Sequence, residues 1–392
     1  SVSGDLINPA VSALKQRVHL DAGYIAIVGD GRYEGHSAAL GISVPSKYGV
    51  FTGSGSYTGV EYDEVDIGRR GSAGFSFAKD LYPSLLFGAG LQTHFGVHGD
   101  GTGFGAGLDV GLIHIVGPVG FMPDVRWGFA LSQLGLGYKP VSGTTGSPSP
   151  FTPTTDIQAV LVQNESVDWS IHTGFSAPSF QNVRYRVGSR VSFFERITLN
   201  VGWDVDLREQ IDGNRPSGSL LPSAGITVRF QTDIKSDDEG VLSDRGWNRS
   251  EIDVHTAWAP LYDGVWAAGA GVQAALGVID RNPPEIEATY PGITYISPNN
   301  DGASDELLLP VRITDERYVM SWTLDITDAD GRLVRRIENK EQRPENEGLQ
   351  NIIDRLLYVE KGVQIPDEIR WDGRTDQGGP APDGEYTFTL TA

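Results

Sequence analysis

The stretch RITLNVGWDVDL, residues 196–207, alternates strictly between apolar and polar side chains. One face of an extended chain would carry Ile197, Leu199, Val201, Trp203, Val205 and Leu207. The other face would carry Thr198, Asn200, Gly202, Asp204 and Asp206. A period of two is typical of a β-strand with one apolar face. Such a strand belongs either to a soluble sandwich or to a membrane barrel around a polar lumen.

Composition narrows the choice of class. The 392 residues carry a formal net charge of −20 and no cysteine, which argues against nucleic acid as a partner and excludes disulfides and thiolate metal sites. The longest smooth apolar stretch, 264–278, is shorter than the roughly 18–20 residues of a membrane-spanning helix. We expect no helical anchor. The chain starts at Ser1 without initiator Met or signal peptide, so we expect a mature, exported chain.

The same alternation recurs along residues 17–280 and predicts 14 strands. Many of them span about 9–13 residues, as tilted strands that cross a bilayer do. The apolar rows carry five tryptophans, several near strand ends, as an interfacial aromatic girdle would: Trp127, Trp169, Trp203, Trp258 and Trp266. This pattern favours an all-β fold, a 14-stranded antiparallel transmembrane β-barrel, over a soluble sandwich.

Connection lengths support the barrel, because outer-membrane barrels have short turns at one end and longer loops at the other. Short turns are expected at 45–46, 79–84, 117–123, 163–166 and 193–196. Longer loops are expected at 61–70, 135–154 and 209–219, and a glycine-rich loop at 99–107 feeds a strand. The stretch 231–250 should be short and is long. It is either a real excursion or an error in the strand count.

Parity along the strands also predicts the side chains that face the lumen. These candidates are Asp21, His94, Arg126, His172, Arg184, Arg186, Asn200, Asp204, Arg229 and His255. The spacing of His94 and His98 does not indicate a metal site, because four residues of a strand span roughly 13 Å. No catalytic constellation is found in the sequence, so we expect neither an enzyme nor a cofactor.

The pattern changes at 281–291, where Pro283 and Pro284 indicate a linker. Beyond it, residues 284–392 carry 22 acidic and 11 basic side chains. Strands are expected at 306–313, 321–328, 333–339, 368–373 and 385–392, with an amphipathic helix at 348–362. These elements predict a small β-sandwich over 286–392. Asn299, Asn300, Asp301 and Asp305 form an oxygen-rich loop that could bind Ca²⁺, although turns favour the same residues.

The segment INPAVSALKQ, 7–16, resembles the Asn-Pro-Ala-x-x-Ala segment near the mature N-terminus of the FadL/PorV group of outer-membrane barrels. The matching residues are Asn8, Pro9, Ala10 and Ala13. Asn8 suits an N-cap and Pro9 the first helical position. The resemblance implies that residues 1–16 form a plug within the barrel of residues 17–280.

Three stretches of the C-terminal region, 297–307, 328–337 and 371–388, resemble the Ig-like domain of the flagellar hook-capping protein FlgD and its relatives. The helix at 348–362 departs from the short version of that fold. The resemblance implies a domain found in surface and secretion proteins.

Three functions stay open. The first is a barrel in the bacterial outer membrane that belongs to a larger envelope or protein-secretion assembly and contacts protein partners through its Ig-like domain. The second is a transporter of small hydrophobic, fatty-acid-like molecules. The third is a structural or adhesive surface protein. An even strand count returns the chain to its starting side, so we expect the C-terminal domain in the periplasm.

Overall fold

The computed structural model describes residues 7–29, 33–62, 65–98, 101–136, 151–211, 221–233, 249–262, 264–277, 283–288, 295–299, 301–315, 318–345 and 348–392. The chain divides into two compact units, Ser1–Val278 and Ile279–Ala392. Within the described part of the chain, no helix is long and apolar enough to cross a membrane.

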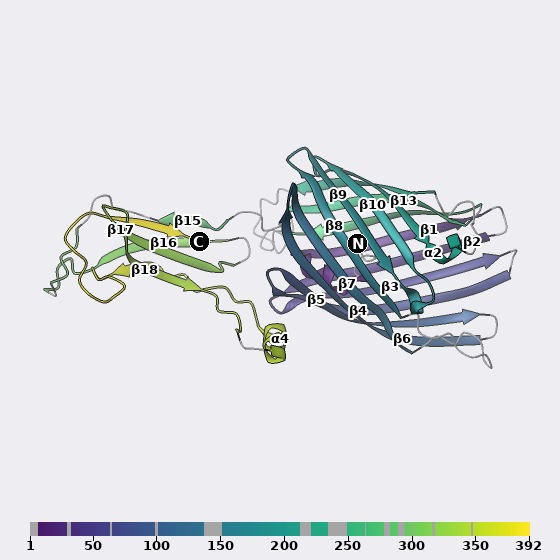
Figure 1. The fold of residues 1–392 in the computed structure, drawn as a ribbon, viewed down its shortest axis with the longest axis horizontal. Coiled ribbons are helices and arrows are strands. Elements are labelled where there is room, and N and C mark those ends of the chain that lie inside the picture. Colours follow the sequence, from purple (N-terminus) through teal and green to yellow (C-terminus); the bar gives the residue numbers. More distant parts are fainter. Residues whose placement is uncertain are drawn as a thin grey trace. The chain divides into compact units, whose positions relative to one another are not determined.

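The first unit is a closed antiparallel barrel of 14 strands in sequence order, sealed by pairing of β1 with β14 (Figure 1). The strands are β1 Val18–Val28, β2 Tyr33–Ser46, β3 Gly49–Tyr62, β4 Val65–Tyr82, β5 Leu85–His98, β6 Gly101–Val119, β7 Met122–Leu136, β8 Thr152–Gln163, β9 Val167–Ser176, β10 Arg184–Phe193, β11 Ile197–Asp206, β12 Ser223–Asp233, β13 Arg249–Tyr262 and β14 Val265–Leu276. The predicted count of 14 is confirmed. On either side of the stretch 231–250, β12 and β13 pair directly with each other; residues 234–248 lie outside the described part.

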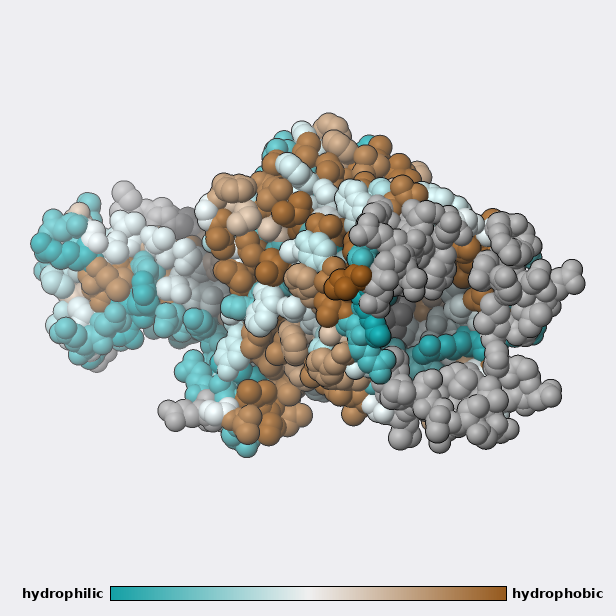
Figure 2. Space-filling model, turned by 45° about the vertical axis from the view of Figure 1, so that its right-hand side comes forward, coloured by the Kyte–Doolittle hydropathy of each residue, from teal (hydrophilic) through white to brown (hydrophobic). Residues whose placement is uncertain are grey.

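The outer face of this barrel is apolar and the inner face polar. Val201 and Trp203 on β11 are 38% and 39% exposed, and apolar side chains cover much of the visible barrel surface (Figure 2). The buried side chains of the barrel include many polar ones, among them Ser43, Thr52, Lys79, Gln92, Asp109, Thr154, Ser170 and Thr198. A soluble protein has the opposite distribution. A closed sheet leaves no backbone edge unpaired in lipid, so this unit is a membrane-spanning barrel of the outer-membrane type.

Two tryptophans on the outer face, Trp127 and Trp169, have partners for their indole N–H groups. Trp127 Nε1 donates to Thr155 Oγ1 at 2.8 Å, and Trp169 Nε1 donates to Ser189 Oγ at 3.0 Å. A buried or lipid-facing indole N–H needs such a partner, because lipid tails offer none.

The two ends of the barrel differ in their connections. At one end, β2–β3, β4–β5, β6–β7, β8–β9 and β10–β11 are joined by two or three residues. At the other end lie the 3₁₀ turn η2 (Pro178–Phe180) and the short helix α2 (Leu207–Ile211). The predicted loop at 61–70 is wrong, because strands occupy most of it. Strand β3 extends to Tyr62 and β4 begins at Val65, with Glu61 opposite Asp66. The glycine-rich stretch 99–107 likewise belongs to strand β6 from Gly101 onward.

The second unit contains two three-stranded antiparallel sheets. One has the order β15-β16-β19, with β15 Glu285–Ala288, β16 Leu307–Thr314 and β19 Glu368–Trp371. The other has the order β18-β17-β20, with β18 Leu333–Lys340, β17 Ser321–Asp328 and β20 Tyr386–Thr391. Buried residues of both sheets, such as Leu309, Leu324, Ile326 and Trp371, form one hydrophobic core.

Two sequence predictions for this unit need correction. Residues 281–291 are not all linker, because β15 pairs with β16 and its Ile286 packs against the core. The predicted helix 348–362 is shorter and forms α4, Gly348–Leu357. The helix ends there because the following residues return to the sandwich: Tyr318 donates a hydrogen bond to Glu360 at 2.8 Å, and Gly362 has a φ of +66°.

Candidate functional site in the barrel lumen

A short 3₁₀ helix, η1 (Pro9–Leu14), lies inside the barrel against β3, β4, β5 and β6. The Asn8 side chain caps it by accepting a hydrogen bond from the Ala10 N–H at 3.0 Å, and Pro9 follows the cap. The predicted cap is therefore confirmed. Ala10 and Ser12 are fully buried.

Glycines of the barrel wall make room for this segment. A Cβ atom on Gly88 would lie 2.3 Å from the Ala10 nitrogen, and one on Gly111 would lie 2.0 Å from Asn8 Oδ1. The Asn8 amide donates to the backbone carbonyl oxygens of Leu112 and Phe129 at 3.2 and 3.4 Å. All four residues of the Asn-Pro-Ala-x-x-Ala segment lie at this contact, since Ala13 packs against the buried cluster of Ala10, Leu86 and Ile113.

The end of the segment is held by polar contacts around the lumen. Ser12 Oγ lies 3.0 Å from Thr52 Oγ1, and Lys15 Nζ donates to Ser43 Oγ at 2.8 Å. Arg17, only 7% exposed, pairs with Glu251 on β13 at 2.7 Å.

Glu251 links this segment to a second charged pair. Its carboxylate lies 3.6 Å from Arg229, which holds Asp253 through two hydrogen bonds of 2.8 and 2.9 Å. A two-pronged contact of this kind is among the stronger polar interactions in proteins. This network of charged side chains links Arg17, which directly precedes β1, to β12 and β13.

Three further ion pairs involve predicted lumen residues. Arg184 pairs with Asp204 at 2.8 Å, and Arg186 pairs with Asp156 at 3.3 Å. Arg126 pairs with Asp124 on its own strand at 2.7 Å.

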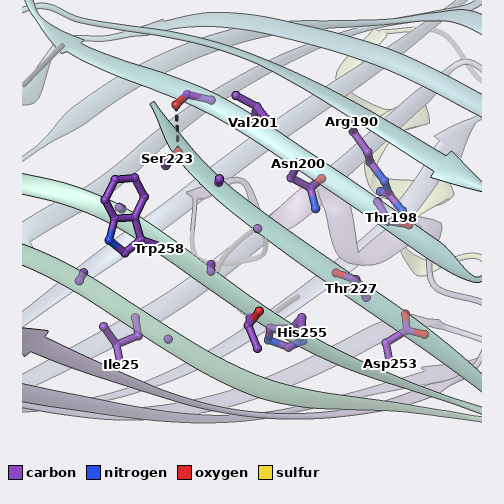
Figure 3. Close-up of a pocket in the computed structure, with 18 of the residues that line it drawn as sticks. Ile25, Arg190, Thr198, Asn200, Val201, Ser223, Thr227, Asp253, His255 and Trp258 are labelled. Atoms are coloured by element: carbon purple, nitrogen blue, oxygen red, sulfur yellow. Dashed lines mark hydrogen bonds between the residues drawn. The ribbon is translucent and has the colours of Figure 1, made fainter. Parts of the chain in front are cut away.

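A cavity of about 600 Å³ follows the walls of β11, β12, β13 and β14 and reaches Ile25 on β1 (Figure 3). Its polar lining includes His172, Arg190, Asn200, Arg229, Asp253 and His255. Its apolar lining includes Ala257, Ala259 and Ala267. The arrangement offers hydrogen-bond donors and acceptors beside a small apolar wall.

Two histidine rings of this cavity lie against glycines of the neighbouring strands. A Cβ atom on Gly188 would meet His172 Cε1 at 2.3 Å, and one on Gly271 would meet His255 Nε2 at 2.4 Å. The glycines therefore let both rings lie close to the wall.

The structure brings four of the predicted lumen residues together in this cavity and leaves the others elsewhere. His172, Asn200, Arg229 and His255 line it. Asp21 accepts a hydrogen bond from Gln273 at 3.4 Å. Among the described residues, the two ring nitrogens of His94 are buried and have no hydrogen-bond partner.

Sequence reasoning missed Arg190 as a cavity residue, and it placed Asp253 on the polar face of its strand without naming it among the lumen candidates. Both carry the parity of predicted lumen residues, Arg190 that of Arg186 on β10 and Asp253 that of His255 on β13. The signal was present, but the predicted row on β10 stopped short of the strand's end.

The described part of the chain holds no group of three or more His, Cys, Asp or Glu side chains that could bind a metal ion. In the oxygen-rich loop, Asn299 and Asp301 accept backbone hydrogen bonds from Asp301 and Ala303, and Asp305 accepts one from Gly302. These are turn contacts. Asn300 lies outside the described residues, and the Ca²⁺ site stays a prediction.

Comparison with known proteins yields structural similarity only. No protein-family model matches the chain, and no curated protein sequence matches it. Similar solved structures include the Pseudomonas putida toluene transporter TodX, with 11% identity, a TM-score of 0.41, and coverage of 68% of this chain and 90% of that chain. The Ralstonia pickettii toluene transporter TbuX has 12% identity, a TM-score of 0.41, and coverage of 68% and 91%. The KdgM porin has 10% identity, a TM-score of 0.31, and coverage of 64% and 97%.

By their descriptions, these solved structures are two toluene transporters and a porin. At such identities the likeness concerns the barrel fold, and nothing about their solutes is carried to this chain. The resemblances to the FadL/PorV group and to FlgD stay proposals.

Proposed function

We propose that the chain is a channel of the FadL/PorV type through which small molecules cross the outer membrane. The observation that carries this proposal is the closed 14-stranded barrel with a luminal cavity of about 600 Å³. Ligand sites in proteins commonly have volumes of roughly 300–1,000 Å³ and combine an apolar wall with a few polar groups. The wall of Ile25, Ala257, Ala259 and Ala267 suits a small apolar moiety, as the transport hypothesis requires.

In this proposal, the N-terminal segment narrows the lumen. A barrel of 14 strands is wider than one that its own side chains fill, which has about eight strands. The wall contact of Asn8 and Ala10 and the Arg17–Glu251 pair fix the segment at both ends inside the barrel. It therefore acts as a plug at the end with the short turns.

Planar-bilayer recording tests the channel. The full-length protein, reconstituted at low density, should give stepwise currents in potassium chloride, and liposomes that contain it should swell in small neutral solutes. Properly folded protein that produces neither currents nor swelling would exclude a channel.

A second function, docking within an envelope assembly, is favoured by helix α4. No residue of α4 is buried, and its apolar face is exposed, with Leu349 at 79% and Leu357 at 73%. Positions 349, 352, 353, 356 and 357 fall on one face at helical spacing. Membrane-surface helices are rich in Lys and Arg, whereas α4 carries one Arg and one Asp. We therefore assign as its binding partner a protein with an apolar groove rather than a membrane surface.

In this second proposal, the C-terminal unit is an Ig-like domain in the periplasm. The segments before and after α4 are joined at their base, since Arg343 lies 3.5 Å from Glu360 and both are largely buried. Purification from native membranes in mild detergent should recover a complex with wild-type protein, and Leu349→Ser/Leu357→Ser should lose it. A matched control is Gln350→Ser, on the polar face. Identical behaviour of all three proteins would exclude α4 as the docking element.

A further inference from the structure

The charges around the luminal cavity do not cancel. Of its Arg, Lys, Asp and Glu lining residues, Arg229 and Asp253 neutralise one another through two hydrogen bonds. The third charged residue of the lining is Arg190. Within the described residues, its guanidinium has no ion pair or hydrogen bond. Counted over the described lining residues, the cavity thus carries one uncompensated positive charge.

The neighbours of Arg190 explain why it is unpaired. On the barrel wall it lies between Ser170 on β9 and Asn200 on β11, and neither is acidic. The nearest carboxylate in register is Asp168, opposite Ser192 and therefore one diagonal step away. Asp168 does not line the cavity, whereas Arg190 does. The other luminal arginines of β10, Arg184 and Arg186, each have an acidic partner.

Uncharged hydrogen-bonding groups surround this cation. Asn200, Thr198 and Thr227 line the same cavity (Figure 3). The His172 ring, which lines the same cavity, lies against Gly188, two residues before Arg190 on β10. A planar guanidinium with free N–H donors matches a carboxylate in geometry and charge.

We infer that this cavity is a binding site for a small organic anion, whose carboxylate contacts Arg190 and Asn200. This inference rests on the proposed channel function and names the chemical class of solute that the channel would select. The paired Arg229 and Asp253 add hydrogen-bonding groups without net charge, and the alanine wall accepts the uncharged part of the solute.

Calorimetric titration of the full-length protein in detergent tests the site, with gluconate as the probe and glucose as its uncharged counterpart of similar size. Gluconate should bind measurably tighter than glucose. Arg190→Gln should weaken gluconate binding by roughly tenfold or more, because a hydrogen bond to a charged group is lost. Asn200→Ala should weaken gluconate binding several-fold. This second variant tests the site if Arg190→Gln does not fold.

The matched control is Arg196→Gln, which removes the same charge from the exposed turn between β10 and β11. It should bind gluconate as the wild type does. Equal affinity for gluconate and glucose, or unchanged affinity in both Arg190→Gln and Asn200→Ala, would overturn the inference. If Arg196→Gln weakened gluconate binding as much as Arg190→Gln, the inference would also be overturned. Such a result would mean that the net charge of the protein, and not a contact with Arg190, attracts the anion.

The same proteins separate this inference from the channel proposal. In planar bilayers, gluconate should block the chloride current of the wild type more strongly than that of Arg190→Gln. Gluconate binding without any current would overturn the channel and keep the site. Currents without selective gluconate binding would keep the channel and overturn the site.

Discussion

Asn8 Nδ2 donates a hydrogen bond to the backbone carbonyl of Leu112 at 3.2 Å, although 104 positions separate the two residues. The contact exists because Gly111 has no side chain in the way. It ties the N-terminal segment to the β6–β7 wall and makes the lumen of the barrel sensitive to single substitutions there.

Gly111→Ala should displace the N-terminal segment. The added Cβ would lie 2.0 Å from Asn8 Oδ1, and such overpacking costs about 1–3 kcal/mol. We expect faster tryptic cleavage at Lys15 and higher single-channel conductance. Deletion of residues 1–16 should also raise the conductance, because it removes the whole segment. Gly23→Ala is the control, since its Cβ would meet nothing closer than 3.9 Å. Matching behaviour of the two variants would contradict the role of the segment as a plug.

Val201→Arg should destabilise the barrel far more than Asn200→Arg. Val201 faces outward near the middle of β11, where lipid disfavours Arg by about 2–4 kcal/mol, while Asn200 faces the cavity. Urea unfolding from lipid vesicles measures the difference. Similar free energies of unfolding for both variants would count against the assigned lipid face.

Arg17→Gln should cost more stability than Arg184→Gln. The Arg17–Glu251 pair is 7% and 13% exposed, and loss of one partner from a buried pair costs about 3–5 kcal/mol, reduced here because Arg229 stays near Glu251. The Arg184–Asp204 pair is 48% and 42% exposed, so its loss should cost about 1 kcal/mol or less. The same vesicle unfolding assay compares them, and the reverse order would refute the ranking.

The C-terminal unit should lose stability in acid partly through Asp325. Two hydrogen bonds from Arg336 lower the pKa of this carboxyl below its usual value of 3.8. A lowered folded-state pKa stabilises the unit above the unfolded-state pKa, and this contribution disappears as the pH falls through the folded-state value. Near-UV circular dichroism of the full chain between about pH 5 and 2 should show a shallower pH dependence for Arg336→Gln. The effect should be small, because both side chains are at the surface.

Protease added to intact cells should spare residues 286–392. The chain enters and leaves the barrel at the end with the short turns, which faces the periplasm in outer-membrane barrels. Cleavage should appear only after the outer membrane is opened. Cleavage of this span on intact cells would invert the topology and favour an adhesive surface protein.

Local sequence patterns determined the strand number and the cap of the N-terminal segment. Alternation along stretches such as 196–207 depends only on adjacent residues, and Asn8 followed by Pro9 is a local helix signal. The same reasoning misplaced the loop at 61–70, because strands that continue beyond the bilayer no longer need apolar residues on their outer face.

Only the tertiary structure decided which of these residues meet. Arg17 pairs with Glu251 across 234 positions, and Asn8 lies over Gly111. Among the residues that the structure describes, Arg190 has no acidic partner, while Arg184 and Arg186 each have one. These relationships depend on the register of every strand pair in a closed barrel. A period of two shows which face a side chain takes, but it does not show which residue of the next strand lies opposite.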